Sequence, residues 1–211
     1  MYKAVIFDLD GVICSTDEYH YLAWKNLADR LGVKFDREKN NRLRGVSRME
    51  SPEIVLEEYQ GNLTETEKAE LAESKNGLYR EYLKEMTPKN LSVDVRDTLN
   101  ALRERGYKLA IGSSSKNTSF ILERIGLASF FDAVTDGTMI ERSKPDPEVF
   151  LKAAASLGFE PESCVVVEDA AAGAEAASRG SFVCAGIGEA STYPTVAYKL
   201  KKVSDLLRCL G

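Results

Sequence analysis

Apolar residues run without interruption from Ala4 to Phe7, and the run stops abruptly at Asp8. A short, continuous apolar run is typical of a strand that is buried on both faces of a parallel sheet. We therefore expect a strand over residues 3–8. Similar apolar runs, bounded by glycine or polar residues, predict further strands over 107–112, 133–134, 164–167 and 182–187.

Between the first two predicted strands the apolar residues follow a helical period instead. They recur every four residues from Tyr19 to Leu31, and Gly32 is a typical helix stop. Ser15 and Glu18 fit a capping box at the start of this helix. We expect residues 17–88 to be helical, including a strongly charged helix from Glu65 to Met86, with loops near 32–37, 44–51 and 61–65.

Beyond residue 90 helical patterns alternate with the strands. Helices are predicted over 95–105, 117–125, 147–157 and 170–178, with Asp146 as N-cap and Pro147 as first residue of the third. This βαβα order predicts an α/β fold, in which helices cover both faces of a parallel sheet. The first strand belongs to that sheet, so the predicted domains are an α/β core (1–14 and 91–211) and an inserted helical domain (15–90).

Polar residues follow directly after the predicted strands. The carboxyl ends of parallel strands meet at one edge of a sheet, so these residues are expected to form one site. That site would combine three or four carboxylates with hydroxyl groups and a lysine. The clusters are Asp8-Leu9-Asp10, Ser113-Ser114-Ser115, Ser143-Lys144-Pro145 and Glu168-Asp169.

Clustered carboxylates repel one another and need a cation. An all-oxygen ligand set suits Mg²⁺, which shares phosphate oxygens, and Lys144 adds fixed positive charge. Asp8 and Asp10 are two residues apart at a strand end, so both point to the same side. One carboxylate can accept a phosphoryl group while the other exchanges protons with the reacting oxygen. Gly11 permits a tight turn beside the phosphate.

Simpler readings of these residues stay open. Asp8 and Asp10 could cap a turn, and Lys144 could be a solvated loop lysine. His20, the single histidine, could be structural on its amphipathic helix. Arg48 could be a surface residue without a ligand, and Trp24 could contribute mainly to the packing of the core and only secondarily to the wall of a pocket.

Composition narrows the classes of partner. The chain has 211 residues, 44% of them apolar, and a net charge of −5, which argues against a general nucleic-acid or anionic-membrane surface. Four cysteines without a C-x-x-C pair argue against a zinc site and favour buried thiols in a reducing compartment. Without a run of about 20 apolar residues or a signal peptide, we expect a cytoplasmic protein, with a monomer as the default.

With these motifs in this order, the sequence resembles the haloacid dehalogenase superfamily of phosphotransferases. The resemblance implies a Rossmann-like catalytic core with a helical cap. It implies Asp8 as nucleophile and Asp10 as general acid and base, with Ser113 and Lys144 binding the transferring phosphoryl group. It also implies Mg²⁺ held by Asp8, the backbone carbonyl of Asp10 and Asp169, with Glu168 close by.

Further motifs are similar to those of the β-phosphoglucomutase subfamily. They are E-Y-H at 18–20, G-V-S-R at 45–48 and S-x-S-K-N at 113–117. The resemblance implies that Arg48 binds a second phosphate of the sugar. The implied substrate-binding residues are Thr16, His20, Trp24, Arg44, Gly45, Val46, Ser47, Arg48, Lys75, Ser114, Ser115, Lys116 and Asn117.

The implied reaction is an isomerisation of β-D-glucose 1-phosphate to glucose 6-phosphate, with glucose 1,6-bisphosphate as intermediate and activator. One alternative is a Mg²⁺-dependent sugar-phosphate phosphatase, and another is a non-catalytic sugar-phosphate-binding protein. Three positions depart from the subfamily pattern. Arg44 stands where lysine is expected, Ala170 where serine is common, and Val93-Asp94 where Pro-Gly is usual.

Overall fold

The strands form one six-stranded sheet in the computed structural model, which describes residues 2–43, 46 and 48–210. The spatial order is β3-β2-β1-β4-β5-β6, and each neighbouring pair is parallel. This confirms the predicted α/β fold. The strands are β1 (Ala4–Phe7), β2 (Lys108–Gly112), β3 (Ala133–Thr135), β4 (Cys164–Glu168), β5 (Val183–Gly186) and β6 (Tyr198–Lys199).

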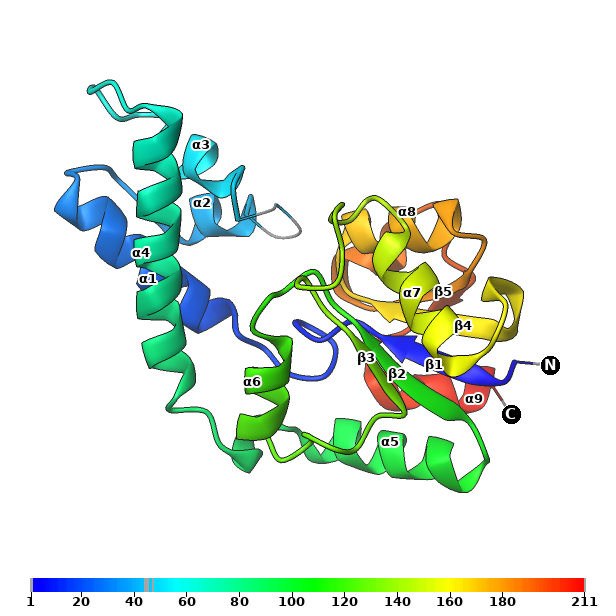
Figure 1. The fold of residues 1–211 in the computed structure, drawn as a ribbon. Helices are drawn as coiled ribbons and strands as arrows, with labels where there is room; N and C mark the ends of the chain where they lie inside the picture. Colours follow the sequence, from blue (N-terminus) through cyan, green and yellow to red (C-terminus); the bar gives the residue numbers. More distant parts are fainter. Residues whose placement is uncertain (1, 44–45, 47, 211) are drawn as a thin grey trace. The chain divides into compact units, whose positions relative to one another are not determined.

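Helices cover both faces of this sheet. In Figure 1, α7 and α8 lie over one face and α5 and α9 over the other. β1 lies between β2 and β4, and all four of its side chains are inaccessible to solvent, which explains its unbroken apolar run. The helices beyond residue 90 are α5 (Val93–Glu104), α6 (Thr118–Arg124), α7 (Glu148–Leu157), α8 (Ala171–Arg179) and α9 (Leu206–Cys209).

The core beneath α7 and α8 combines small and aromatic side chains. Alanines of both helices let their backbones approach the sheet, and Phe150 and Phe182 fill the space between with ring centroids 6.1 Å apart. Full burial of a side chain such as that of Phe150 contributes about 1.5–3 kcal/mol. This packing fixes the carboxyl edge of β1, β2 and β4.

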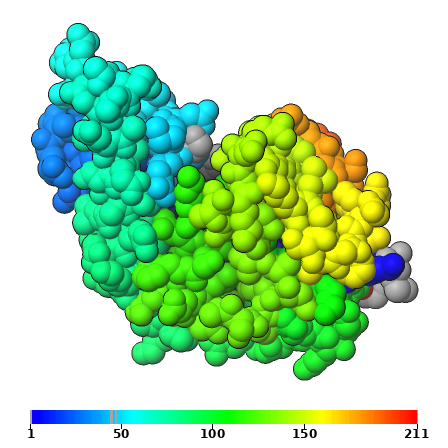
Figure 2. Space-filling model, in the orientation of Figure 1, coloured from blue at the N-terminus to red at the C-terminus, as the bar shows by residue number. Residues whose placement is uncertain are grey.

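The chain divides into two compact units. Unit 1 comprises Met1–Ser15 and Met86–Gly211 and contains the sheet; unit 2 is Thr16–Glu85. Figure 2 follows the chain by colour, with unit 2 in blue to cyan-green. Within the described residues, no helix is long and apolar enough to span a bilayer. The helices of unit 2 are α1 (Asp17–Arg30), α2 (Arg37–Asn41), α3 (Ser51–Val55) and α4 (Glu65–Leu83).

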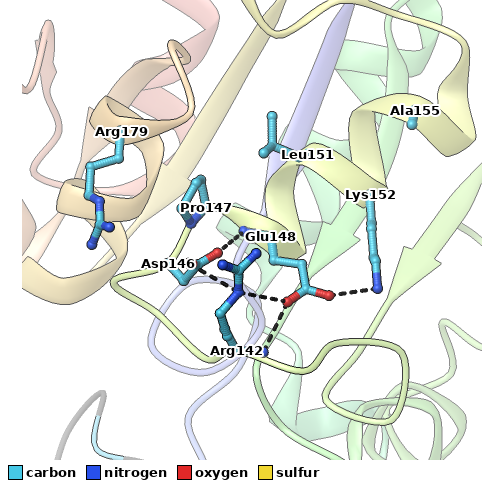
Figure 3. A pocket seen from close by; sticks show the side chains of 8 residues that line it. All are labelled: Arg142, Asp146, Pro147, Glu148, Leu151, Lys152, Ala155 and Arg179. Atoms are coloured by element: carbon cyan, nitrogen blue, oxygen red, sulfur yellow. Dashed lines mark hydrogen bonds and ion pairs between the residues drawn. The ribbon is translucent and has the colours of Figure 1, made fainter.

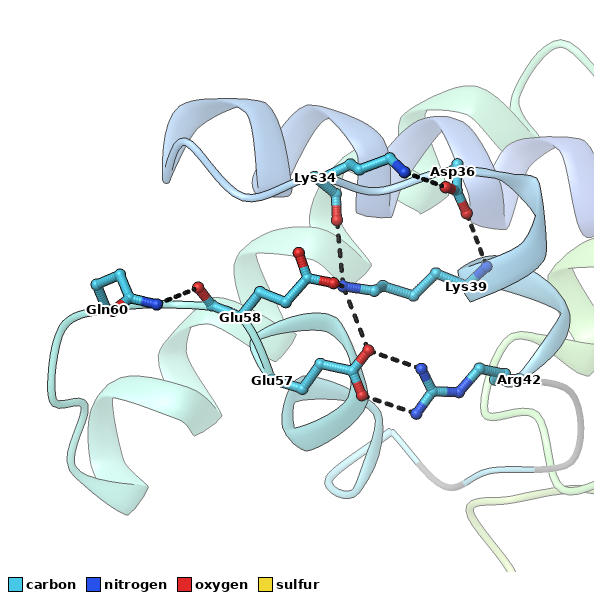
Figure 4. A network of polar contacts seen from close by, with 7 residues as sticks. All are labelled: Lys34, Asp36, Lys39, Arg42, Glu57, Glu58 and Gln60. Carbon is cyan, nitrogen blue, oxygen red and sulfur yellow. Dashed lines mark hydrogen bonds and ion pairs between the residues drawn. The ribbon is translucent and has the colours of Figure 1, made fainter.

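Unit 2 has its own apolar core and a polar network at one side. Trp24 and Leu27 of α1 pack with Phe35 and Val55. Lys39 is buried, and its ammonium group donates to the Lys34 carbonyl and to Glu58, while the Arg42 guanidinium holds Glu57 through two contacts of 2.7 Å (Figure 4). A buried ammonium group needs such hydrogen-bond partners. Because Lys39 lies on α2 while Glu57 and Glu58 follow α3, the network joins these two segments.

Several element boundaries differ from the predicted ones. The predicted capping box of Ser15 and Glu18 is wrong: Thr16 is the N-cap, without a side-chain cap, and the Glu18 carboxylate pairs with Arg37 at 2.5 and 2.9 Å. The helix predicted from Pro147 begins at Glu148, although Asp146 still accepts its backbone N–H at 3.0 Å.

The elements near the carboxyl terminus were not predicted. β6 has only two residues, and α9 only four, so neither leaves a periodic signal in the sequence. Short 3₁₀ turns complete the chain at Pro88–Asn90, Pro161–Ser163, Gly188–Thr192 and Val203–Asp205.

Candidate active site

Lys144 joins two buried carboxylates at the carboxyl edge of the sheet. Its ammonium group donates to Asp8, which follows β1, and to Glu168, the last residue of β4. β1 and β4 are neighbouring strands, so the two acids meet at the crevice where the strand order reverses. The side chains of Lys144 and Glu168 are only 7% and 1% exposed, which places this ion pair in a low-dielectric setting.

Burial and charge together set the protonation of this group. Burial raises the pKa of Asp8 well above its usual value, and the Glu168 and Asp169 carboxylates raise it further, while Lys144 opposes them. Burial alone would lower the pKa of Lys144, but Asp8 and Glu168 outweigh it and raise the pKa. The lysine therefore stays cationic, and one cation does not fully balance the surrounding acids.

Asp10 and Gly11 form a tight turn that lies against the side chain of Asp169. The Gly11 N–H donates to the Cys14 carbonyl at 2.8 Å, and Gly11 has a φ of +84°. A Cβ atom at Gly11 would lie 2.0 Å from Oδ2 of Asp169, so only glycine lets this carboxylate sit against the turn. The turn after β1 and the acid after β4 are therefore in direct contact.

Glu168 also supports the backbone at the start of α8. Its Oε2 accepts the N–H groups of Asp169 and Ala170 at 2.9 and 3.0 Å. A Cβ at Gly173 would lie 1.9 Å from Glu168 Oε1, so a helical glycine makes room for the carboxylate. Ala170 is the N-cap of α8 and provides no side-chain cap, in keeping with its departure from the expected serine.

These oxygens fit a magnesium ion in their chemistry. The expected donors are the carboxylates of Asp8 and Asp169 with a backbone carbonyl, a hard all-oxygen set of the kind Mg²⁺ prefers. Burial raises the pKa of Asp8 first, the Glu168 and Asp169 carboxylates raise it further, and a divalent cation would balance the negative charge of these acids. In the described part of the chain, no three His, Cys, Asp or Glu side chains form a ready metal cluster, so the assignment stays a prediction.

The serine cluster forms a compact turn after β2. Ser113 is buried and donates its N–H to the Thr135 carbonyl at 3.0 Å, and its Oγ accepts the Ser115 N–H at 3.2 Å. The Ser115 Oγ in turn accepts the N–H of Asn117, the N-cap of α6, whereas Lys116 is exposed. The buried Oγ of Ser114 has no hydrogen-bond partner within the described residues.

In unit 2, His20 and Lys75 form a second cluster. The Lys75 ammonium lies 2.7 Å from His20 Nδ1 and over the rings of Trp24 and Tyr79, at 4.9 and 4.7 Å. Because lysine can only donate, Nδ1 is the acceptor and Nε2 carries the ring proton. Burial, and then Lys75 and Arg48, lower the pKa of His20 well below its usual value, so the ring is neutral at pH 7.

Thr16 and Tyr79 complete this cluster. Thr16 is buried, and its Oγ1 accepts the Tyr79 hydroxyl at 3.0 Å. The rings of Tyr79 and His20 contact each other with centroids 4.1 Å apart and planes tilted by 32°. Tyr79 was not predicted from the sequence as a member of this cluster. It lies four residues after Lys75 on α4, and that helical spacing is the signal that could have found it.

The predicted phosphate clamp is described only in part. Arg48 NH1 lies 3.2 Å from Glu73 Oε2, and Glu73 also accepts from Asn76 at 3.4 Å. Val46 is half-buried and donates its N–H to the Leu43 carbonyl at 3.1 Å. The predicted substrate-binding residues Arg44, Gly45 and Ser47 lie outside the described residues.

Comparisons with known proteins show which family and which relatives this chain is similar to. The model of the family described as haloacid dehalogenase-like hydrolase matches residues 2–180. β-Phosphoglucomutase of Bacillus subtilis is 39% identical over 206 residues, which cover 97% of this chain and 91% of that protein. A phosphorylated carbohydrates phosphatase of Thermotoga maritima is 32% identical over 179 residues, covering 83% of this chain and 80% of that protein.

The fold agrees with a solved relative as well. The crystal structure of β-phosphoglucomutase from Clostridium difficile superposes with a TM-score of 0.89 and 34% sequence identity. The match covers 98% of this chain and 93% of that one. The similarity therefore includes both units rather than the sheet alone.

Proposed function

Because this chain belongs to the haloacid dehalogenase-like hydrolase family, we propose that it is a β-phosphoglucomutase that interconverts β-D-glucose 1-phosphate and glucose 6-phosphate. The observation that carries the phosphoryl-transfer part is the contact of one buried lysine with both Asp8 and Glu168. The identity of the sugar rests on the 39% identical relative from Bacillus subtilis.

In this proposal Asp8 is the nucleophile. Its carboxylate oxygen forms a bond to the phosphorus of the substrate while the bond from phosphorus to the sugar oxygen breaks. Asp10 gives that departing oxygen a proton. In the other direction, a sugar hydroxyl gives its proton to Asp10, attacks the aspartyl phosphate and releases the Asp8 carboxylate. Glucose 1,6-bisphosphate is the intermediate that links the two transfers and can prime the enzyme.

Lys144 holds positive charge where the phosphoryl oxygens bind, since Asp8 and Glu168 keep it protonated. Ser113 is assigned to the same phosphoryl group, and the buried Oγ of Ser114, which has no hydrogen-bond partner within the described residues, supports the assignment of Ser114 to substrate binding. A Mg²⁺ ion held by Asp8, Asp169 and the Asp10 carbonyl, with Glu168 close by, would neutralise charge on the phosphoryl group.

The helical unit provides the residues proposed for the sugar and its second phosphate. An arginine can hold a phosphate through two parallel hydrogen bonds, so Arg48 is assigned to the phosphate that is not reacting. A second anion site is what a bisphosphate intermediate requires. His20, Lys75, Thr16 and Trp24 are proposed to bind the sugar, with Ser115, Lys116 and Asn117 of unit 1 supporting the second phosphate.

A phosphatase acting on sugar phosphates is the second candidate. It is favoured by the 32% identical phosphatase of Thermotoga maritima. It would share the first half-reaction, and water instead of a sugar hydroxyl would then attack the aspartyl phosphate. The exclusion of water from the phosphoenzyme decides between the two reactions.

Product analysis tests this proposal. Purified protein is incubated with β-glucose 1-phosphate, Mg²⁺ and a trace of glucose 1,6-bisphosphate, and glucose 6-phosphate and free phosphate are quantified together. A large excess of glucose 6-phosphate is expected. An excess of free phosphate would replace the mutase with the phosphatase, and neither product would reject this sugar as the substrate.

A further inference from the structure

Lys144 lies on an irregular loop whose position needs an explanation. The loop runs from β3 to α7 and has no regular hydrogen-bonded ladder over residues 136–147. Lys144 nevertheless makes two buried ion pairs, with Asp8 and Glu168. A long side chain on a loose loop would lose much conformational freedom in such a contact, so other groups must hold the backbone.

The first turn of α7 holds this loop through Glu148. The Glu148 carboxylate accepts the backbone N–H of Arg142 at 2.9 Å and that of Glu141 at 3.2 Å. Both donors lie two or three residues before Lys144. The carboxylate also pairs with the Lys152 ammonium at 2.6 Å, one helical turn away. Glu148 therefore fastens the loop to a helix that the core fixes through Phe150.

Neighbouring groups support the same loop. Lys152 donates to the Met139 carbonyl at 2.6 Å, and Arg179 of α8 donates to the Pro145 carbonyl at 3.2 Å. In Figure 3 the Glu148 carboxylate lies between Lys152 and Arg142, and these side chains line a shallow depression of about 550 Å³.

We infer that Glu148 is a positioning residue that sets the place of the Lys144 ammonium group by fixing the backbone of residues 141–142. The inference rests on the proposed role of Lys144 in phosphoryl binding. The Lys152 hydrogen bond, followed by the Arg142 N–H, lowers the pKa of Glu148 to about 2. The Glu148 carboxylate is therefore ionised at neutral pH.

Asp132 offers a matched control. It too is a mostly covered carboxylate, 18% exposed against 12% for Glu148, that holds a backbone N–H (Leu109, 2.9 Å) and a lysine (Lys108, 2.8 Å). It precedes β3 and contacts the start of β2, so it lies at the amino edge of the sheet, away from Lys144. Asp132→Asn should affect stability without affecting phosphate binding.

The experiment measures the binding of inorganic phosphate by calorimetry in the presence of Mg²⁺. Lys144→Ala is expected to weaken binding more than about 10-fold, and Glu148→Ala about 10-fold, the scale of lost supporting contacts around a site. In the Lys144→Ala background, Glu148→Ala should cause less than about a 2-fold further loss, because the two act through one group. Glu148→Gln retains one acceptor oxygen, so it should fold and give an intermediate loss.

The possible outcomes separate this inference from the proposed function. Normal binding by Lys144→Ala would reject the role of Lys144 itself and thereby the premise. Weak binding by Lys144→Ala but normal binding by both Glu148 variants would reject the positioning role alone. An equal loss from Glu148→Ala in both backgrounds, or an equal loss from Asp132→Asn, would also overturn it, because the effect would then not act through Lys144.

Discussion

At the scale of single residues, the buried contacts of Lys144 determine the charge of the site. Removing one partner of a buried ion pair leaves an unpaired charge, which is more costly than the pair itself. Asp8 and Glu168 share the lysine, and Glu168 is one of the charges that raise the pKa of Asp8. The two carboxylates of the D-L-D motif have different surroundings: Asp8 is buried against Lys144, and Asp10 is only half-buried.

This difference leads to a prediction for Asp10→Asn. Turnover of β-glucose 1-phosphate should fall about 10²–10⁴-fold, because general acid and base catalysis is lost. Phosphorylation of Asp8 by acetyl phosphate should fall much less, since acetate leaves without a proton. The rate of glucose 6-phosphate formation measures the turnover, and stopped-flow measurement of the phosphoenzyme measures the phosphorylation of Asp8.

Asp8→Asn is the matched control for that measurement, because it should abolish both reactions. An Asp10→Asn variant that loses the two reactions equally would contradict the division of roles between the two aspartates.

His20 gives a prediction about pH. Its folded-state pKa is depressed, so below the unfolded value of about 6.5 the unfolded chain binds the proton that the folded chain excludes. The contribution to stability is complete above pH 6.5 and is lost as pH falls through the folded pKa. His20→Gln should remove this part of the pH dependence, which has a limiting slope of about 1.4 kcal/mol per pH unit.

Urea unfolding between pH 7.5 and pH 5 measures the slope. Since His20 is the single histidine, the difference between variant and parent isolates its titration. Tyr79→Phe is the control, because it removes the contact with Thr16 but no group that titrates in this range. An unchanged slope in His20→Gln would show that His20 is protonated in the folded state as readily as in the unfolded one.

At the scale of elements, the turn that follows β1 lies against Asp169. Gly11 combines a positive φ with a site in which a Cβ would overlap the Asp169 carboxylate. Gly106 has the same φ of +84° but no atom within 4 Å of its Cβ position. The two glycines therefore separate the effect of backbone strain from that of contact with Asp169.

Gly11→Ala should raise the Mg²⁺ concentration required for half-maximal activity about 10-fold, because the methyl group displaces an expected metal ligand. Gly106→Ala should cost about 1 kcal/mol of stability or somewhat more through backbone strain, with an unchanged Mg²⁺ requirement. Mg²⁺ titrations of activity and thermal unfolding of both variants provide the measurement. Equal Mg²⁺ requirements in the two variants would reject Asp169 as a ligand.

The elements also show how far the sequence could predict this protein. The strands β1, β2 and β4 contain the apolar runs 4–7, 109–111 and 164–167, so both their existence and the meeting of their polar ends could be predicted. The two-residue β6 could not, since its pairing with β5 depends on tertiary contacts. The start of α1 at Asp17 was predicted correctly, but its capping box was not, because the Glu18 carboxylate pairs with Arg37, which no local pattern reveals.

The same distinction holds for the candidate site: positions set by strand ends could be predicted, and positions set by tertiary contacts could not. Asp8, Asp10, Lys144 and Glu168-Asp169 occupy strand ends or the loop beside them, and topology brings such positions together. Glu148 and Tyr79 escaped prediction because their roles come from contacts: one fixes a loop backbone, and the other shares Thr16 and His20. From the sequence, a glutamate in the first turn of a helix is expected only to interact favourably with the helix dipole.

At the scale of the whole molecule, the chain divides its chemistry between two units. Unit 1 holds Asp8, the proposed nucleophile, together with Lys144 and the other acids, and we expect these groups to suffice for exchange of a phosphoryl group with Asp8. Unit 2 holds His20, Lys75 and Arg48, which carry cationic and hydrogen-bonding groups but no proposed role in breaking bonds. The preference for a sugar hydroxyl over water as acceptor is therefore a property that we expect unit 2 to control.

Arg48→Ala tests this division. Loss of a charge-assisted contact of about 1.5–3 kcal/mol should lower production of glucose 6-phosphate about 10- to 100-fold, while phosphorylation of Asp8 by acetyl phosphate stays unchanged. Arg42→Ala is the control, because Arg42 also lies in unit 2 and pairs with a glutamate but has no proposed role (Figure 4). Quantifying glucose 6-phosphate and free phosphate together should show a larger share of phosphate for Arg48→Ala only. Equal product ratios in both variants would mean that Arg48 does not hold the second phosphate, and the case for a mutase would then rest on sequence similarity alone.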